Sequence, residues 1–88
     1  MDQYYVYVIE SKIFKRRYKG LTKDLDNRII EHNNGKTKST KAFVPWTLVY
    51  CEEFPNLAEA RKRERYFKTA AGRRFLNDKL GPVVQGIE

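Results

Sequence analysis

The spacing of hydrophobic residues changes along this 88-residue chain. Residues 3–10 and 46–54 are rich in β-branched and aromatic side chains, which favour strands. Residues 17–22 (RYKGLT) are expected to form a short strand that pairs with the first as an antiparallel hairpin. In residues 25–33 and 56–71 the apolar positions recur every three or four residues, which predicts helices. The expected order is therefore strand, strand, helix, strand, helix.

Capping residues support both predicted helices. Asp24 is a suitable N-cap for the helix that ends near Asn33, and Gly35 beyond it is a typical C-terminal stop. Asn56 precedes the second helix, and Glu59 three residues later completes a pattern like a capping box. We expect Gly72 to end the second helix, before a short last helical segment, RRFLNDKL.

Strict alternation would divide each strand between two faces. In the first strand, one face receives Tyr5, Tyr7 and Ile9, and the other receives Tyr4, Val6 and Val8. In the third strand, one face receives Trp46, Leu48 and Tyr50, and the other receives Thr47, Val49 and Cys51. In the helix of residues 25–33, the buried side would consist of Leu25, Ile29 and Ile30. We interpret Cys51 as a buried structural thiol, because a single cysteine provides neither a disulfide partner nor a zinc site.

These elements predict a small α/β domain of the α+β type. Its centre would be a three-stranded antiparallel sheet flanked by helices, in the order β-β-α-β-α, with a short C-terminal helix. Residues 1–80 would form the one domain that a chain of this length supports. Residues 81–88 (GPVVQGIE) would form a flexible tail.

The charge balance narrows the possible partners. Eighteen Lys and Arg against eleven Asp and Glu leave a net charge of +7, which favours nucleic acid over a membrane surface. No apolar run approaches the length of a membrane span, and no basic region precedes the first apolar run. We therefore expect a cytoplasmic protein without a membrane segment.

Glu64 is an unexpected residue in the apolar stripe of the second helix. The stripe consists of Leu57, Ala60, Glu64, Phe67 and Ala71. An ionised carboxylate in such a stripe is unfavourable unless a cation, a metal ion or hydrogen bonds meet it. Glu64 is therefore a candidate site residue.

Simpler interpretations also fit the polar residues. Glu64 lies four residues before Lys68, and a Glu-to-Lys pair at this spacing is common on helix surfaces. Arg28 and His32 share one flank of a short helix, where such side chains are most often solvated. We interpret residues 35–45 as a mobile loop that attracts phosphates.

Four motifs in order resemble the GIY-YIG nuclease superfamily. They are Tyr5-Val6-Tyr7, Tyr18-Lys19-Gly20, LDNRIIEHNNGK, and EARKRERYFK followed by GRRF. The resemblance covers about residues 3–77 and is greatest to the small stand-alone bacterial members. Three features depart from the pattern: Tyr5 replaces a glycine, Lys19 replaces an apolar residue, and Asn77 is an uncertain match for a later asparagine.

The resemblance implies a set of site residues. Glu64 would bind one divalent cation, Mg²⁺ or Mn²⁺, and Arg28 would contact the scissile phosphate. Tyr7 and Tyr18 would position or deprotonate the attacking water, and His32 resembles a further active-site residue of some members. Contacts with the nucleic acid, DNA rather than RNA, would come from Lys36, Lys38, Lys41, Arg61, Arg63 and Arg65.

Three functions are compatible with this pattern. The first is a metal-dependent endonuclease that hydrolyses DNA phosphodiester bonds, in DNA repair or processing. The second is a nucleic-acid-binding module that has the nuclease fold and little or no turnover. The third is a basic scaffold that binds another protein. The sequence leaves the oligomeric state open.

Overall fold

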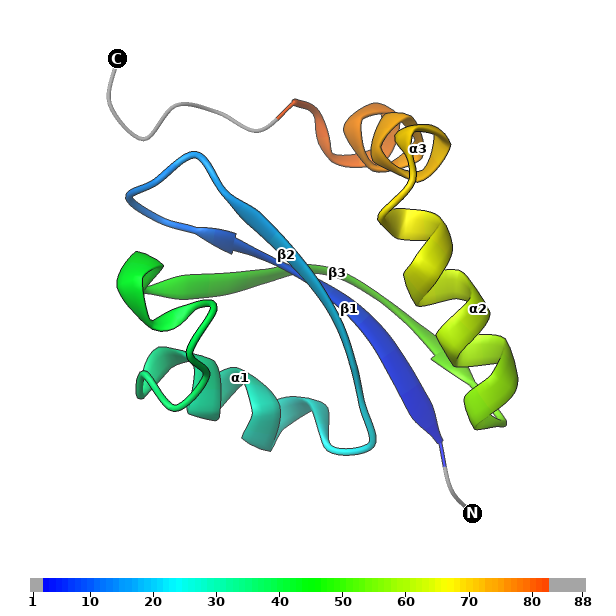
Figure 1. Cartoon of the computed structure of the whole chain (residues 1–88), viewed down its shortest axis with the longest axis horizontal. Coiled ribbons are helices and arrows are strands. Elements are labelled where there is room, and N and C mark those ends of the chain that lie inside the picture. The colour runs from blue at the N-terminus through cyan, green and yellow to red at the C-terminus, as the bar shows by residue number, and fades with distance from the viewer. Residues whose placement is uncertain (1–2, 83–88) are drawn as a thin grey trace.

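A computed structural model describes residues 3–82, which form a twisted sheet covered by helices on both faces (Figure 1). The elements follow the order β1 (Tyr4–Ser11), β2 (Arg17–Thr22), α1 (Leu25–Asn33), the 3₁₀ helix η1 (Lys41–Phe43), β3 (Trp46–Phe54), α2 (Leu57–Phe67) and α3 (Ala70–Leu80). The predicted fold class is confirmed. The final helix has 11 residues and is as long as α2, so it is not the short segment that we expected.

The sheet is antiparallel throughout and has the order β2-β1-β3. Helix α1 covers one face, and α2 and α3 cover the other. Each face has its own apolar cluster. Val6, Val8, Ala60, Phe67 and Leu76 are buried beneath α2 and α3, whereas Tyr7, Ile9 and Trp46 are buried beneath α1.

A register shift in β3 changes the faces that simple alternation predicts. The β1–β3 pairing steps from Val8 opposite Tyr50 to Ile9 opposite Leu48, so one residue of β3 bulges. As a result, Trp46 packs beneath α1 while Tyr50 packs beneath α2 and α3. The prediction that these two side chains share a face is therefore wrong.

Cys51 also differs from its prediction. We expected a buried thiol, but Cys51 is exposed. The reason is that β3 lies at the edge of the sheet and Cys51 pairs with Tyr7, so its side chain lies on the α1 face, away from α2 and α3. Strand-like composition alone does not distinguish an edge strand from a central one.

The helix predicted for residues 56–71 is interrupted. Helix α2 ends at Phe67, and the Thr69 side chain then accepts a hydrogen bond from the Gly72 backbone N–H to cap α3. Gly72 lies inside α3 and is buried, so it does not end a helix. Leu57 and Ala71 are exposed, so the buried apolar stripe of this helix is shorter than predicted.

The capping residues lie where the sequence indicates. Asp24 accepts a hydrogen bond from the Asn27 backbone N–H, and Asn56 accepts one from that of Glu59. The predicted buried side of α1 is only partly correct. Leu25 and Ile29 pack against the cluster beneath α1, but Ile30 is 56% exposed.

The connection between α1 and β3 is more ordered than the predicted mobile loop. It contains η1, and its Thr40 is buried. The Trp46 indole N–H donates to the Thr40 carbonyl oxygen at 2.9 Å. The Asn33 amide exchanges two hydrogen bonds with the Trp46 backbone, which joins the end of α1 to the start of β3.

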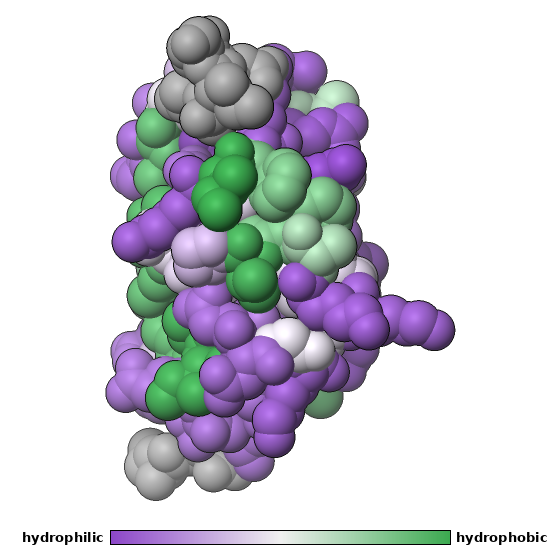
Figure 2. Space-filling model, turned by 90° about the vertical axis from the view of Figure 1, so that its left-hand side faces the viewer, coloured by the Kyte–Doolittle hydropathy of each residue, from purple (hydrophilic) through white to green (hydrophobic). Residues whose placement is uncertain are grey.

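Apolar side chains emerge where the β1–β2 turn meets η1. Ile13 and Phe14 are 49% and 43% exposed, and the Phe14 ring lies edge-on to Phe43 at 5.4 Å. Figure 2 faces this end of the molecule and shows apolar residues among hydrophilic ones.

No helix within residues 3–82 combines the length and hydrophobicity that a membrane crossing needs. Most of the predicted tail, residues 83–88, lies outside the described part.

Gly72 provides a test of this packing. A Cβ atom there would lie 1.9 Å from the Tyr66 carbonyl oxygen and 2.6 Å from the Phe67 Cα atom. In an ordinary helix interior Gly→Ala stabilises by about 1 kcal/mol. We expect Gly72→Ala instead to destabilise by about 1–3 kcal/mol, because the backbone of α2 must move. Urea unfolding should show this loss, with the exposed-site variant Ala71→Ser as the control; a stabilised Gly72→Ala protein would contradict the packing.

Candidate active site

Tyr7 is the central residue of the candidate site. It lies in the middle of β1 opposite Gly20 of β2, and its side chain crosses β2 at that glycine. A Cβ atom on Gly20 would lie 2.3 Å from the Tyr7 hydroxyl oxygen. The absent side chain therefore lets the buried Tyr7 ring extend across the edge strand.

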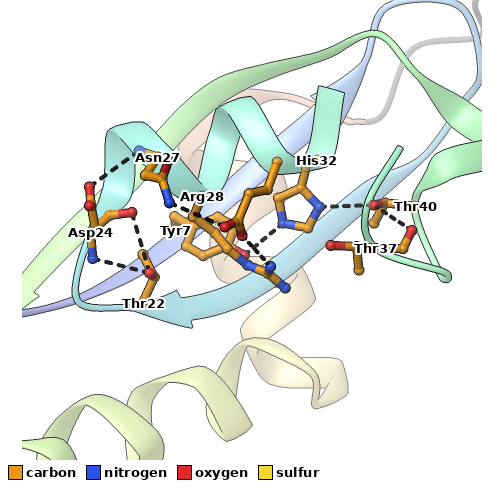
Figure 3. Close-up of polar contacts among 9 residues, drawn as sticks. Tyr7, Thr22, Asp24, Asn27, Arg28, His32, Thr37 and Thr40 are labelled. Carbon is orange, nitrogen blue, oxygen red and sulfur yellow. Dashed lines mark hydrogen bonds and ion pairs between the residues drawn. The ribbon is translucent and has the colours of Figure 1, made fainter. Parts of the chain in front are cut away.

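His32 of α1 holds the Tyr7 hydroxyl. Its Nε2 atom lies 2.8 Å from the hydroxyl oxygen, and its Nδ1 atom lies 2.8 Å from Thr40 Oγ1 (Figure 3). The Thr40 hydroxyl in turn donates to the Thr37 carbonyl oxygen at 3.4 Å. This chain assigns the proton of the imidazole to Nδ1, so Nε2 accepts from Tyr7.

Arg28, one helical turn before His32, extends toward the same hydroxyl (Figure 3). Its guanidinium donates from Nη1 to Glu31 Oε1 at 2.9 Å. The hydrogen bond to Glu31 raises the pKa of Arg28, and the nearby Tyr7 hydroxyl acts in the same direction. The guanidinium is therefore a cation that Glu31 orients toward Tyr7.

Tyr18 of β2 completes an aromatic group around this network. Its ring centroid lies 6.4 Å from that of Tyr7 and 5.1 Å from that of His32. Tyr18 is only half-buried, unlike Tyr7 and His32. Tyr18 is thus more exposed to solvent than Tyr7.

Glu64 approaches from the other side of the sheet, on α2. Its side chain is 20% exposed, and its Oε2 atom lies 3.3 Å from Lys68 Nζ. The Glu64 carboxylate also acts electrostatically on Tyr7. Glu64 is therefore part of the predicted helix pair, but it is also within electrostatic range of the tyrosine at the centre of the site.

Burial keeps the central network uncharged at neutral pH. Burial raises the pKa of the Tyr7 hydroxyl, with Tyr18 and Glu64 adding to the effect and Arg28 opposing it. Burial lowers the pKa of His32, and the nearby Arg28 charge lowers it further. Tyr7 is thus a phenol and His32 a neutral imidazole, flanked by the charges of Arg28 and Glu64.

A metal ion is compatible with the donors at this site. Within residues 3–82 no three His, Cys, Asp or Glu side chains form a metal-binding group. Mg²⁺ commonly binds through one or two carboxylates and keeps several waters, with substrate phosphates as further ligands. Glu64 alone fits that kind of site, and it does not fit a closed site of several protein ligands.

The structure adds residues that the sequence interpretation missed. Glu31 holds Arg28, Thr40 holds His32, and Gly20 makes room for Tyr7. Glu31 lies three residues after Arg28, which is a detectable spacing for an ion pair. No spacing in the sequence indicates Thr40, because only the folded path of the α1–β3 connection brings its hydroxyl to His32.

The six side chains predicted to contact nucleic acid differ in their exposure to solvent and in the contacts that they already make. Lys36, Lys38, Lys41, Arg61 and Arg65 are exposed. Arg63 instead donates two hydrogen bonds to Glu52 and stacks over the rings of Tyr66, Phe67 and Phe75. We therefore assign Arg63 to the packing of α2 and omit it from the proposed contacts.

Gly20 should be essential for the position of Tyr7. We expect Gly20→Ala to destabilise the protein by about 1–3 kcal/mol, because the new methyl group overlaps the Tyr7 ring. In a Tyr7→Ala background the same change should be nearly neutral, since the overlapping ring is gone. Urea unfolding of the four proteins of this cycle tests the contact, and equal effects of Gly20→Ala in both backgrounds would exclude it.

His32 should make stability depend on pH. Its pKa is lower in the folded protein than its ordinary value of 6.5, so the unfolded chain binds a proton more readily. Stability should therefore be full above about pH 6.5 and fall as the pH decreases, by at most about 1.4 kcal/mol per pH unit.

His32 is the single histidine of the chain, so His32→Gln should remove most of the slope between pH 7 and pH 5.5. Unfolding midpoints of wild type and variant, measured across this interval, provide the comparison. An unchanged slope in the variant would show that another group is responsible.

Known proteins share the sequence pattern and the fold of this chain. Residues 3–77 match the family described as the GIY-YIG catalytic domain. A UPF0213 protein of Staphylococcus saprophyticus is 46% identical over 70 residues, which cover 78% of this chain and 84% of that protein. A UPF0213 protein of Clostridium perfringens is 45% identical over 65 residues, which cover 73% of this chain and 69% of that protein.

A solved structure has the same fold. The solution NMR structure of the UPF0213 protein BH0048 from Bacillus halodurans superposes with a TM-score of 0.55 at 34% sequence identity. The match covers 90% of this chain and 86% of that one. Because the family match spans nearly the whole described domain, the chain belongs to the GIY-YIG family.

Proposed function

We propose that this protein is a divalent-metal-dependent endonuclease that hydrolyses DNA phosphodiester bonds. The observation that carries the proposal is the position of Tyr7, which His32 contacts from α1 and on which Arg28 of α1 and Glu64 of α2 act electrostatically. Membership of a nuclease family and the net charge of +7 support nucleic acid as the substrate. The proposal includes a cytoplasmic location and a role in DNA repair or processing.

Each charged residue would stabilise a different part of the reaction. Arg28 would donate to the oxygens of the scissile phosphate, where negative charge accumulates in the transition state. Glu64 would hold one Mg²⁺ or Mn²⁺ ion, which when bound supplies Lewis acidity toward the phosphate oxygens. Glu31 would keep Arg28 aimed at the phosphate, since it holds the guanidinium at 2.9 Å.

The two tyrosines would have different roles. Tyr7 remains protonated because burial raises its pKa, so it acts as a hydrogen-bonding group and not as a phenolate. Its proton points to His32 Nε2, and His32 could accept it while the Tyr7 oxygen receives a proton from the attacking water. The more accessible Tyr18 hydroxyl would position that water.

A nucleic-acid-binding module with little turnover is the second candidate. The ion pair between Lys68 and Glu64 favours it, because the ammonium group neutralises the carboxylate on which a metal ion would depend. The same ion pair is exposed on the lysine side, so Lys68 can move away when a cation binds. Measured turnover therefore separates the two candidates.

Substitution of the charged residues tests the endonuclease proposal. We expect Glu64→Gln and Arg28→Ala each to lower the cleavage rate by about 10²-fold or more, because each removes an electrostatic contact to the transition state. The exposed-site variant Asp78→Asn should cleave like wild type. The measurement is cleavage of labelled branched, single-stranded and duplex DNA with Mg²⁺ or Mn²⁺.

The outcomes distinguish the two candidates. Cleavage that depends on Glu64 and Arg28 supports the endonuclease. Salt-dependent binding without cleavage of any substrate supports the binding module. Equal cleavage by wild type and Glu64→Gln would reject the assigned site.

A further inference from the structure

A second group of cations lies outside the Tyr7 network. It lines a cleft of about 390 Å³ between the β1–β2 hairpin and α3. Lys15, Arg17 and Lys19 contribute from the hairpin, and Arg73 contributes from α3. None of these four belongs to the site around Tyr7 or to the lysine-rich connection before β3.

Arg17 is the fixed part of this cleft. Its side chain is 5% exposed and donates to Glu10 at 2.7 Å, to Asn77 Oδ1 at 3.0 Å and to the Gly81 carbonyl oxygen at 2.6 Å. These bonds join the hairpin to the C-terminal end of α3. Arg17 therefore fixes the hairpin against the end of α3 on one side of the cleft.

The other three cations have no acidic partner. Within residues 3–82, Lys15, Lys19 and Arg73 form no ion pair with a carboxylate. Lys19 is half-buried; burial lowers its pKa, and the charges of Arg73, Arg17 and Lys68 lower it further. An anion in the cleft would relieve this repulsion.

Lys68 connects the cleft to the candidate active site. The Arg73 guanidinium donates to the Lys68 carbonyl oxygen at 2.8 Å, and Lys68 Nζ lies 3.3 Å from Glu64. Lys68 is also among the charges that act on Lys19. Lys68, which pairs with Glu64 at the end of α2, is therefore followed by the cleft cations Arg73 and Lys19.

We propose that this cleft binds backbone phosphates of the DNA strand that enters the active site, through Lys19 and Arg73. The assignment rests on the proposed function, because it takes the strand to pass Glu64. The cations are spread over two elements, which suits successive phosphates along a chain better than one enclosed anion. The contacts would supply affinity without base preference.

The test is binding of labelled duplex DNA, measured by fluorescence anisotropy without divalent metal over a series of salt concentrations. The double variant Lys19→Gln/Arg73→Gln removes two cleft cations. The control, Lys62→Gln/Arg74→Gln, removes two exposed cations, one from α2 and one from α3, neither of which lines the cleft. Thermal unfolding checks that both variants remain folded.

We expect the cleft variant to reduce the slope of log K against log salt by about 1.8, since each lost phosphate contact on duplex DNA contributes about 0.9. The control should change the slope by less than half as much. Equal slopes in the two variants would overturn the assignment of the cleft and leave the endonuclease proposal intact.

Two further results have defined meanings. A slope difference in a protein that cleaves no DNA supports the cleft and rejects the endonuclease, whereas absence of any wild-type binding rejects both.

Discussion

The passage of the Tyr7 side chain across β2 at Gly20 is the constraint on which the candidate site depends. Tyr7 belongs to the central strand, and without a gap in the edge strand its hydroxyl could not reach the sheet edge. At that edge it meets groups from α1, and it lies within the electrostatic influence of α2. A single missing Cβ atom thus lets side chains from opposite faces of the sheet act together.

Charge and neutrality alternate in this site for a physical reason. The fully buried members, Tyr7 and His32, are neutral because burial penalises their ionised forms. The partly exposed members, Arg28 and Glu64, each form an ion pair, with Glu31 and Lys68 respectively. The site therefore contains a buried neutral pair with two ion-paired side chains beside it.

Helix α2 connects the candidate site around Tyr7 with the cleft that Lys19 and Arg73 line. Phe67 and Ala60 dock it on the sheet, and Glu64 lies between them in the helix with its side chain 20% exposed. Its last residues meet α3 so closely that Gly72 has no room for a side chain, and Arg73 then lies beside Lys68. The break between the two helices, where one continuous helix was predicted, lets Arg73 contact the carbonyl oxygen of Lys68, the ion-pair partner of Glu64.

Local sequence determined much of this protein. The strand composition, the caps at Asp24 and Asn56, and the ordered motifs carrying Tyr7, Tyr18, Arg28, His32 and Glu64 predicted the element order and the family, because these signals depend on near neighbours in the chain. Tertiary structure decided the rest. The bulge that separates Trp46 from Tyr50, the exposure of Cys51 and the contact of Thr40 with His32 depend on pairing between distant segments, which no local period records.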